Sequence, residues 1–387
     1  MKVLLTARQP GGGIRTFLRY IYSQKCFSDV SLTLVAPDVG LSGYLDKHIP
    51  AHRFETTYIQ PSNLTLFRTV REKLAEGDFD LVHSHGFSAG VMTEMARVGC
   101  GIPHLMTAHD VFRPEQFPGI KGQAKRHALS LLFRRIDRIH TVTESAGVNF
   151  TDFMPWVRPE HIRTILHGID TAYFRRGQCQ DLRSALNIPN ERPLVGYFGR
   201  FMAQKGFRTL VDAMGLMSAS VESTLMPHVI TFGWGGFIRE DYQYVRECGL
   251  SEYFHQLPAT DAMPDMLKSV DMVAMPSRWE ACGLLAMEAL CTGVPIIGTN
   301  CVGLRDVLEG TPGRMVPPQA SHELAMAIQE FVETPRGIDF EQYQPIACRR
   351  FDVGRPAAGL RRLYAEMMGD LGFTAPAEED QGKHSNA

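Results

Sequence analysis

Short apolar runs alternate with longer amphipathic segments along most of this chain, and the alternation starts again near its middle. A short apolar run bounded by glycine, proline or polar residues is typical of a buried strand, whereas apolar residues spaced by three and four are typical of a helix. Regular alternation of the two predicts parallel sheets covered by helices, an α/β fold. The predicted strands cover residues 3–7, 30–36, 54–59, 81–86, 104–110, 139–142 and 162–166, and then 194–199, 229–232, 270–275, 296–297 and 315–316.

The two series of strands predict two α/β domains, residues 1–175 and residues 176–350. Between them, residues 174–192 show no regular pattern and end among prolines, as linkers do. A chain of 387 residues is long enough for two domains of ordinary size. We expect the polar tail, residues 371–387, to be disordered.

The composition indicates a soluble globular protein, because 44% of the residues are hydrophobic and the formal net charge is −2. A nearly neutral chain gives no sign of nucleic-acid binding. The eight cysteines include no Cys-x-x-Cys pair, so we interpret them as buried thiols of a reducing compartment. The first apolar run is too short for a signal peptide, and no later stretch reaches transmembrane length. These observations predict a cytoplasmic protein.

The most informative stretch is residues 275–303, where a strand, a loop, a helix and a second strand are predicted in turn. In a parallel sheet, the loop after the first strand lies at the edge that binds ligands. Backbone amides at residues 283–285 open the helix and can bind an anion such as a diphosphate. Glu280 in the loop and Glu288 in the helix can accept hydrogen bonds from sugar hydroxyls. The alternative is that one glutamate only favours the helix dipole and the other only faces solvent.

Two cations, Arg200 and Lys205, follow the first strand of the second series. Cations at the carboxyl end of a strand can offset the negative charge that develops on a departing phosphate. Three glycines, residues 11–13, follow the first strand of the first series, where they would let the backbone approach a ligand. Their spacing is not Gly-x-Gly-x-x-Gly, so a nicotinamide or flavin site is disfavoured. A tight turn with no ligand is the alternative.

Histidines end two predicted strands of the first series. His109 lies where doubly wound sheets place their chemistry, although a single histidine is more often structural. His83 and His85 suggest a metal site, but no third ligand follows at a suitable spacing. For this pair we favour a structural role.

Together these residues resemble the signature of the retaining glycosyltransferases of family 4. The resemblance rests on Pro276-Ser277-x-x-Glu280 followed by Glu288, Ala289, Gly293, Pro295 and Gly303, and on Gly199-Arg200-x(4)-Lys205-Gly206. Cys282 departs from it, because the family usually has a bulky apolar residue there. The resemblance implies a GT-B fold, in which two Rossmann-like domains face each other across a cleft, with a helix at 351–370 that returns to the first domain. The reaction it implies is metal-independent transfer of a sugar from a nucleotide diphosphate sugar to an acceptor hydroxyl, with retention and without a cofactor.

The resemblance also assigns roles to the candidate residues. Four are implied to be catalytic: His109 and Glu280 at the donor sugar, and Arg200 and Lys205 at the diphosphate. The other implied donor contacts are Gly12 and Gly13 at the phosphate and the acceptor, Gly233 and Gly235 beside the nucleotide, the backbone of Leu257 at the base, Gly283, Leu284 and Leu285 at phosphate and sugar, and Glu288 at the ribose. Trp234 can stack on the base or be an ordinary core or surface aromatic residue.

The basic segment 113–138 carries apolar residues between its cations. Such a segment can lie on an anionic membrane or dock an acidic acceptor, or it can be an ordinary helix with a solvated face. The resemblance favours the inner face of a membrane and a glycan or lipid-linked acceptor. Two other functions stay open, a GT-B nucleotide-sugar epimerase or hydrolase and a non-catalytic nucleotide-sugar binder. A glycosidase with paired carboxylates is disfavoured, because donor hydroxyls explain both glutamates better.

Overall fold

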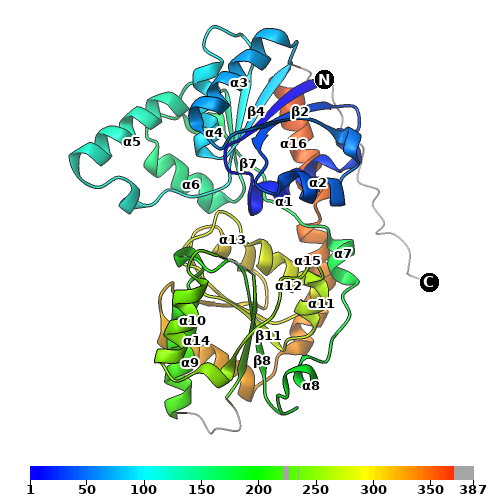
Figure 1. The fold of residues 1–387 in the computed structure, drawn as a ribbon, viewed down its shortest axis with the longest axis vertical. Helices are drawn as coiled ribbons and strands as arrows, with labels where there is room; N and C mark the ends of the chain where they lie inside the picture. The colour runs from blue at the N-terminus through cyan, green and yellow to red at the C-terminus, as the bar shows by residue number, and fades with distance from the viewer. Residues whose placement is uncertain (221–225, 234, 370–387) are drawn as a thin grey trace.

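The computed structural model describes residues 1–220, 226–233 and 235–369, which form two sheets of parallel strands. Figure 1 shows the two sheets in separate halves of the molecule, each surrounded by helices. The predicted α/β class is therefore confirmed. Trp234 and the tail at 371–387 lie outside the described residues.

The N-terminal half contains a sheet with the strand order β3-β2-β1-β4-β5-β6-β7. Its strands are β1 (Lys2–Ala7), β2 (Ser31–Pro37), β3 (Phe54–Ile59), β4 (Leu81–His85), β5 (His104–Ala108), β6 (Arg138–Thr141) and β7 (Ile162–Thr164). Its longer helices are α1 (Gly13–Tyr22), α2 (Leu41–His48), α3 (Asn63–Glu76), α4 (Phe87–Ala96), α5 (Gly119–Phe133) and α6 (Glu144–Phe153). The central strands β1, β4 and β5 are buried without alternation, as expected for a sheet covered on both faces.

The C-terminal half contains a sheet with the strand order β10-β9-β8-β11-β12-β13. Its strands are β8 (Leu194–Phe198), β9 (His228–Phe232), β10 (Phe254–Gln256), β11 (Met272–Met275), β12 (Ile296–Thr299) and β13 (Arg314–Val316). The helices of this half and of the connections are α7 (Thr171–Arg175), α8 (Leu182–Leu186), α9 (Phe207–Ser220), α10 (Ile238–Glu247), α11 (Met263–Lys268), α12 (Leu284–Thr292), α13 (Leu304–Leu308), α14 (Ser321–Glu333), α15 (Gly337–Phe351) and α16 (Gly354–Met367).

Each sheet has one point where the strand order reverses. In the N-terminal half this point lies between β1 and β4, and in the C-terminal half it lies between β8 and β11. Ligands of open α/β sheets bind outside the carboxyl ends of the strands at this point. The glycine loop follows β1, the segment with Arg200 and Lys205 follows β8, and the loop with Glu280 follows β11. The topology therefore brings most of the predicted site to these two positions.

The last helix packs on the N-terminal half, as Figure 1 shows for α16 beside α1. The hydroxyl of Tyr364 lies 2.9 Å from that of Tyr22, and Arg361 forms an ion pair with Asp29 at 3.0 Å. Two elements differ from the prediction. The linker predicted at 174–192 contains the short helix α8, and the chain before α16 forms a separate helix, α15, which includes Pro345.

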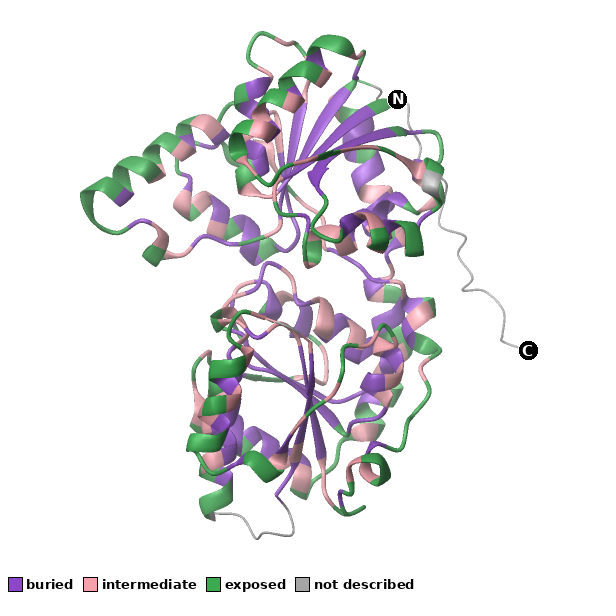
Figure 2. Ribbon diagram, in the orientation of Figure 1, coloured by how far each residue is buried: buried purple, intermediate pink, exposed green. Residues whose placement is uncertain are grey.

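Buried residues line both sheets, and exposed residues cover the outer faces of the helices, most visibly along α5 (Figure 2). The strands β1, β4 and β8 are buried over nearly their whole length. Within the described residues, no helix is both long enough and apolar enough to cross a membrane.

Candidate functional site

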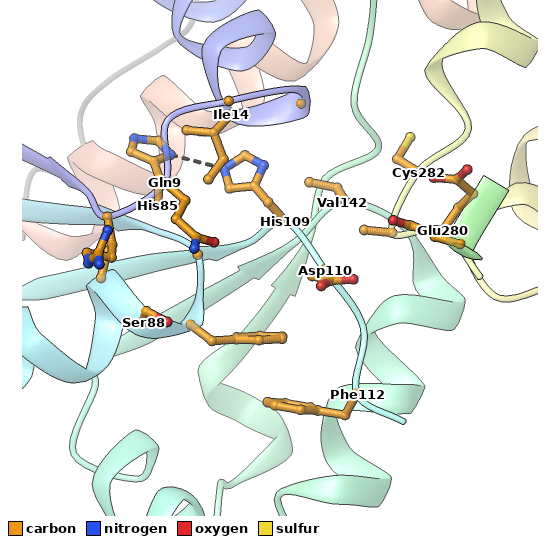
Figure 3. A pocket seen from close by; sticks show the side chains of 18 of the residues that line it. Gln9, Ile14, His85, Ser88, His109, Asp110, Phe112, Val142, Glu280 and Cys282 are labelled. Atoms are coloured by element: carbon orange, nitrogen blue, oxygen red, sulfur yellow. Dashed lines mark hydrogen bonds between the residues drawn. The ribbon is translucent and has the colours of Figure 1, made fainter. Parts of the chain in front are cut away.

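A cavity of about 1140 Å³ opens between the two halves at the carboxyl ends of the strands. Seven of the predicted site residues line it: Gly13, His109, Arg200, Lys205, Glu280, Leu284 and Leu285. Figure 3 shows His109 and Asp110 of the N-terminal half facing Glu280 and Cys282 of the C-terminal half. Both halves therefore contribute side chains to one site.

Arg200 is free to bind a ligand. Its guanidinium forms no hydrogen bond or ion pair with any residue in the described part of the chain, although it lies on the cavity wall. It reaches across to the glycine loop, where a Cβ placed on Gly12 would lie 3.3 Å from Nη2 of Arg200. Gly12 also has a φ of +57°, a conformation that glycine adopts without strain. The loop after β1 and the cation after β8 are thus in close contact.

Lys205 is held by two residues of the loop after β11. Its Nζ donates to Oε1 of Glu280 at 2.6 Å, and Oγ of Ser277 donates to the same oxygen at 2.7 Å. Glu280 is 5% exposed, so its charge depends on these two partners. The geometry leaves two roles for Glu280, a contact to the sugar or a counter-ion that positions Lys205.

Two helices point their amino termini at the cavity. Leu284 and Leu285 of α12 line it, as do Gly13 and Ile14 of α1. In the described structure the amides of Gly283 and Leu285 have no hydrogen-bond acceptor, whereas the amide of Leu284 donates to the carbonyl of Cys282 at 3.1 Å. Free amides at helix amino termini carry partial positive charge. Together with Arg200 and Lys205, they make this part of the cavity suited to a diphosphate.

Glu288 lies one turn into α12, off the cavity wall. Its carboxyl group makes no hydrogen bond to any residue that the structure describes. Burial raises its pKa from 4.5 to about 7, and the charges of Lys205 and Arg19 only partly oppose this rise. This half-buried carboxyl group has no donor in the described structure, so it is available to accept hydrogen bonds from hydroxyl groups such as those of a ribose.

His109 lies on the cavity wall and belongs to a histidine network that extends into the buried interior. Its Nε2 lies 3.1 Å from Nδ1 of His85, and Nε2 of His85 lies 3.4 Å from the hydroxyl of Tyr22 (Figure 3 shows the first of these contacts). His83 extends the network, since its Nδ1 lies 2.6 Å from the hydroxyl of Tyr364 in α16. Burial holds the pKa of His109 well below 6.5, and the neighbouring histidines lower it further. His109 is therefore neutral at physiological pH.

His85 also lines the cavity, which the sequence analysis did not predict. The pair His83 and His85 has hydrogen-bond partners of its own, in agreement with the structural role favoured above. Across the described residues, no group of three or more His, Cys, Asp or Glu side chains is arranged to hold a metal ion.

Six predicted donor residues do not line the cavity: Gly12, Gly233, Gly235, Leu257, Gly283 and Glu288. A Cβ on Gly233 would lie 2.5 Å from the carbonyl oxygen of Gly199, and one on Gly235 would lie 2.1 Å from that of Phe201. Both glycines therefore let the loop after β9 pack on the loop after β8. The amide of Leu257 already donates to the carbonyl of Thr231 at 2.7 Å.

The prediction of buried thiols is confirmed for Cys291, Cys301 and Cys348, whereas Cys179 and Cys248 are exposed. Cys282 lies on the cavity wall and is partly exposed. Burial raises the pKa of the Cys282 thiol, and the nearby carboxylates of Glu280 and Asp306 raise it further. The Cys282 thiol is therefore neutral. It is a small uncharged side chain at a position where the family signature usually has a bulky apolar residue.

Contacts between the halves hold the loop that carries Glu280, and the sequence analysis did not predict them. Oγ1 of Thr143 donates to the carbonyl of Ala281 at 2.9 Å. Ser145 donates to Asp306 through both its amide and its hydroxyl, and it accepts from the amide of Gly303 at 2.7 Å. Ser145 and Asp306 are 161 residues apart in the sequence, so no local pattern could have paired them.

Two family models match this chain. Residues 11–173 match the model for Glycosyltransferase Family 4, and residues 192–334 match the model for Glycosyl transferases group 1. A curated relative, the D-inositol 3-phosphate glycosyltransferase of Rhodococcus jostii, is 29% identical over 344 residues, which cover 83% of this chain and 75% of that protein.

Solved structures resemble the whole described fold. HepE from Anabaena in complex with UDP-glucose superposes with a TM-score of 0.80 at 23% identity, over 96% of this chain and 100% of that chain. Sucrose-phosphate synthase from Thermosynechococcus elongatus superposes with a TM-score of 0.78 at 20% identity, over 95% of this chain and 99% of that chain. At these identities the likeness concerns the fold, and it confirms the predicted GT-B architecture.

Proposed function

This chain belongs to glycosyltransferase family 4. On this basis we propose that it is a retaining enzyme whose sugar donor is a UDP-sugar. The enzyme transfers a sugar from a nucleotide sugar to an acceptor. Retention, metal independence, the uracil base and the individual residue roles are our proposal. The observation that supports it most strongly is the unpaired guanidinium of Arg200 beside two helix amino termini in one cavity.

In the proposed reaction, the bond between C1 of the sugar and the diphosphate oxygen breaks, and the acceptor oxygen bonds to C1 on the same face. The acceptor proton passes to the departing phosphate oxygen. Arg200, Lys205 and the α12 amides would stabilise the negative charge that develops there. Because Glu280 holds Lys205 in the free protein, we propose that Lys205 turns to the diphosphate when the donor binds. Glu280 would then accept from sugar hydroxyls.

We propose uracil as the base of the donor because similar solved structures contain UDP. HepE of Anabaena binds UDP and UDP-glucose in its solved structures, at 22–23% identity to this chain. The Rhodococcus jostii relative acts on D-inositol 3-phosphate, and we carry over only the use of a sugar donor, because identity of 29% leaves the acceptor undefined.

Thermal unfolding with UDP, GDP, ADP, dTDP and their sugars, each with and without magnesium, tests the proposal. A UDP-sugar at one hundred times its Kd is expected to stabilise the protein by about 2.7 kcal/mol. The same shift is expected without magnesium, because protein cations bind the diphosphate. Stabilisation by another nucleotide would show that the donor carries a base other than uracil. Stabilisation by none of them would contradict donor binding in this cavity.

Donor affinity is expected to depend on pH through Glu288. Below a pH of about 7 the free carboxyl group is protonated, so binding of the ribose by the carboxylate requires release of a proton. The KM for the UDP-sugar should therefore rise by about tenfold per pH unit below this value and stay level above it. A Glu288→Gln variant should show a higher KM with a flat profile. A wild-type profile that is equally flat would argue against ribose binding by Glu288.

We further propose a cytoplasmic enzyme that contacts the inner face of a membrane through the segment 113–138. Within α5, Ile120 is 91% exposed and lies beside the exposed Lys121, an arrangement that suits an anionic bilayer surface. Arg126 donates to backbone carbonyls of the protein instead. Cosedimentation with anionic but not neutral vesicles, lost in Ile120→Asp, would support this contact, and equal binding to both would oppose it.

A further inference from the structure

The cavity extends beyond the proposed transfer site into an apolar branch of the N-terminal half. Its walls come from α4, from the loop after β5 and from α5, and they carry Phe87, Val91, Met92, Phe112, Leu129 and Phe133. The rings of Phe87 and Phe112 are stacked, with centroids 4.1 Å apart and planes 9° apart. Figure 3 shows Phe112 below Asp110, so the branch begins next to the transfer site.

Four of these six wall residues are accessible to a ligand, whereas Phe112 and Phe133 are buried and form the base of the walls in the core. Phe87, Val91, Met92 and Leu129 are only partly buried in the described structure, and each faces the cavity. Other members of the same aromatic cluster, such as Phe150, are buried and do not line it. Partly exposed apolar side chains that converge on a cavity are typical of a site for an apolar ligand.

The branch is continuous with the polar part of the cavity. The same cavity is also lined by Arg200, Lys205 and Glu280, and its volume of about 1140 Å³ exceeds the roughly 300–1,000 Å³ of a usual single-ligand pocket. A molecule in the branch would therefore place its polar end near Asp110 and His109, where the sugar is to be transferred.

From these observations we infer that the acceptor is an amphiphile whose alkyl or isoprenoid chain lies between α4 and α5. This inference rests on the proposed function for the transfer itself. The binding of the chain depends only on the apolar branch, so the two can be tested separately.

The probe is a series of n-alkyl β-D-glucosides of increasing chain length, titrated calorimetrically into the full chain below the micelle concentration. Because each buried methylene contributes a similar increment, Kd is expected to fall by about fourfold per added methylene until the branch is filled. The same dependence is expected when UDP-glucose is present, because the donor occupies the other end of the cavity.

Matched variants on the same helices locate the binding. Leu129→Asp and Met92→Gln change the branch, whereas Leu131→Asp and Met95→Gln change neighbours that are 44% and 45% exposed and do not line the cavity. The first pair should raise Kd for octyl glucoside by tenfold or more, and the second pair should leave it unchanged. All four should bind UDP-glucose like the wild type.

A Kd that does not depend on chain length would overturn the inference, as would equal effects of both pairs of variants. If the wild-type protein binds the alkyl glucosides but does not bind UDP-glucose, the result would instead contradict the proposed function. The two failures are therefore distinguishable.

Discussion

Replacing Lys205 with alanine is expected to lower kcat by about 10²- to 10³-fold, the usual effect of removing one group that stabilises charge in a transition state. In the proposed reaction, Lys205 compensates the charge that develops on the departing diphosphate, so the loss should appear in kcat more than in the KM for the donor. Initial rates at saturating UDP-sugar, measured by release of UDP, would give both constants.

The same substitution also leaves Glu280 with Ser277 alone, because Lys205 Nζ is its partner at 2.6 Å. Chemical denaturation should therefore show a loss of about 1–3 kcal/mol, the cost of a buried charged group without its partner. Adding Glu280→Gln should restore most of this stability without restoring kcat. The exposed Lys25 provides the control, since Lys25→Ala should change neither quantity. If kcat of Lys205→Ala falls only in proportion to its loss of folded protein, Lys205 acts only by supporting the fold.

Replacing Gly206 with alanine is expected to destabilise the protein by more than about 3 kcal/mol, the upper part of the range for single substitutions. Gly206 has a φ of +69°, and a Cβ at this position would lie 1.9 Å from the carbonyl oxygen of Pro276. The substitution therefore adds backbone strain to a direct clash between the loops after β8 and β11. Because Lys205 is the preceding residue, activity should fall together with stability.

Thermal and chemical unfolding would measure this effect. The control is Gly43→Ala in α2, where a Cβ would meet nothing within 4 Å. There, alanine should raise stability by up to about 1 kcal/mol because it favours the helix. A loss of under 1 kcal/mol in Gly206→Ala would mean that the two loops move apart easily. In that case, the contact between the loops after β8 and β11 does not position Lys205.

Much of the site could be predicted from local sequence because its residues follow strands. The apolar runs before Arg200 and before Pro276 are β8 and β11, and these two strands flank the point where the strand order reverses. Local pattern also placed His109 at the end of β5, on the cavity wall. Residues that follow adjacent parallel strands share one edge of a sheet, so their chain positions alone bring them together.

The rest could not be predicted in this way. The family resemblance implies that Gly233 and Gly235 lie beside the nucleotide, but it gave no sign that they also let their loop pack closely on the backbone of Gly199 and Phe201. That role depends on an approach of two loops, and composition carries no signal for it. Of the aromatic residues of the apolar branch, the sequence analysis included only Phe133, within the basic segment 113–138, because the convergence of Phe87, Phe112 and Phe133 depends on how α5 packs on α4.

The sequence by itself determined the fold class, the parallel sheet in each half and the types of side chain that follow the strands, because strand periodicity and turn chemistry are local properties. Tertiary structure decided how the two halves meet. It paired Lys205 with Glu280, left Arg200 unpaired, and joined Ser145 to Asp306 across the cleft. It also connected His109 through His85 to the last helix. These arrangements depend on contacts between residues distant in the chain, which no local pattern encodes.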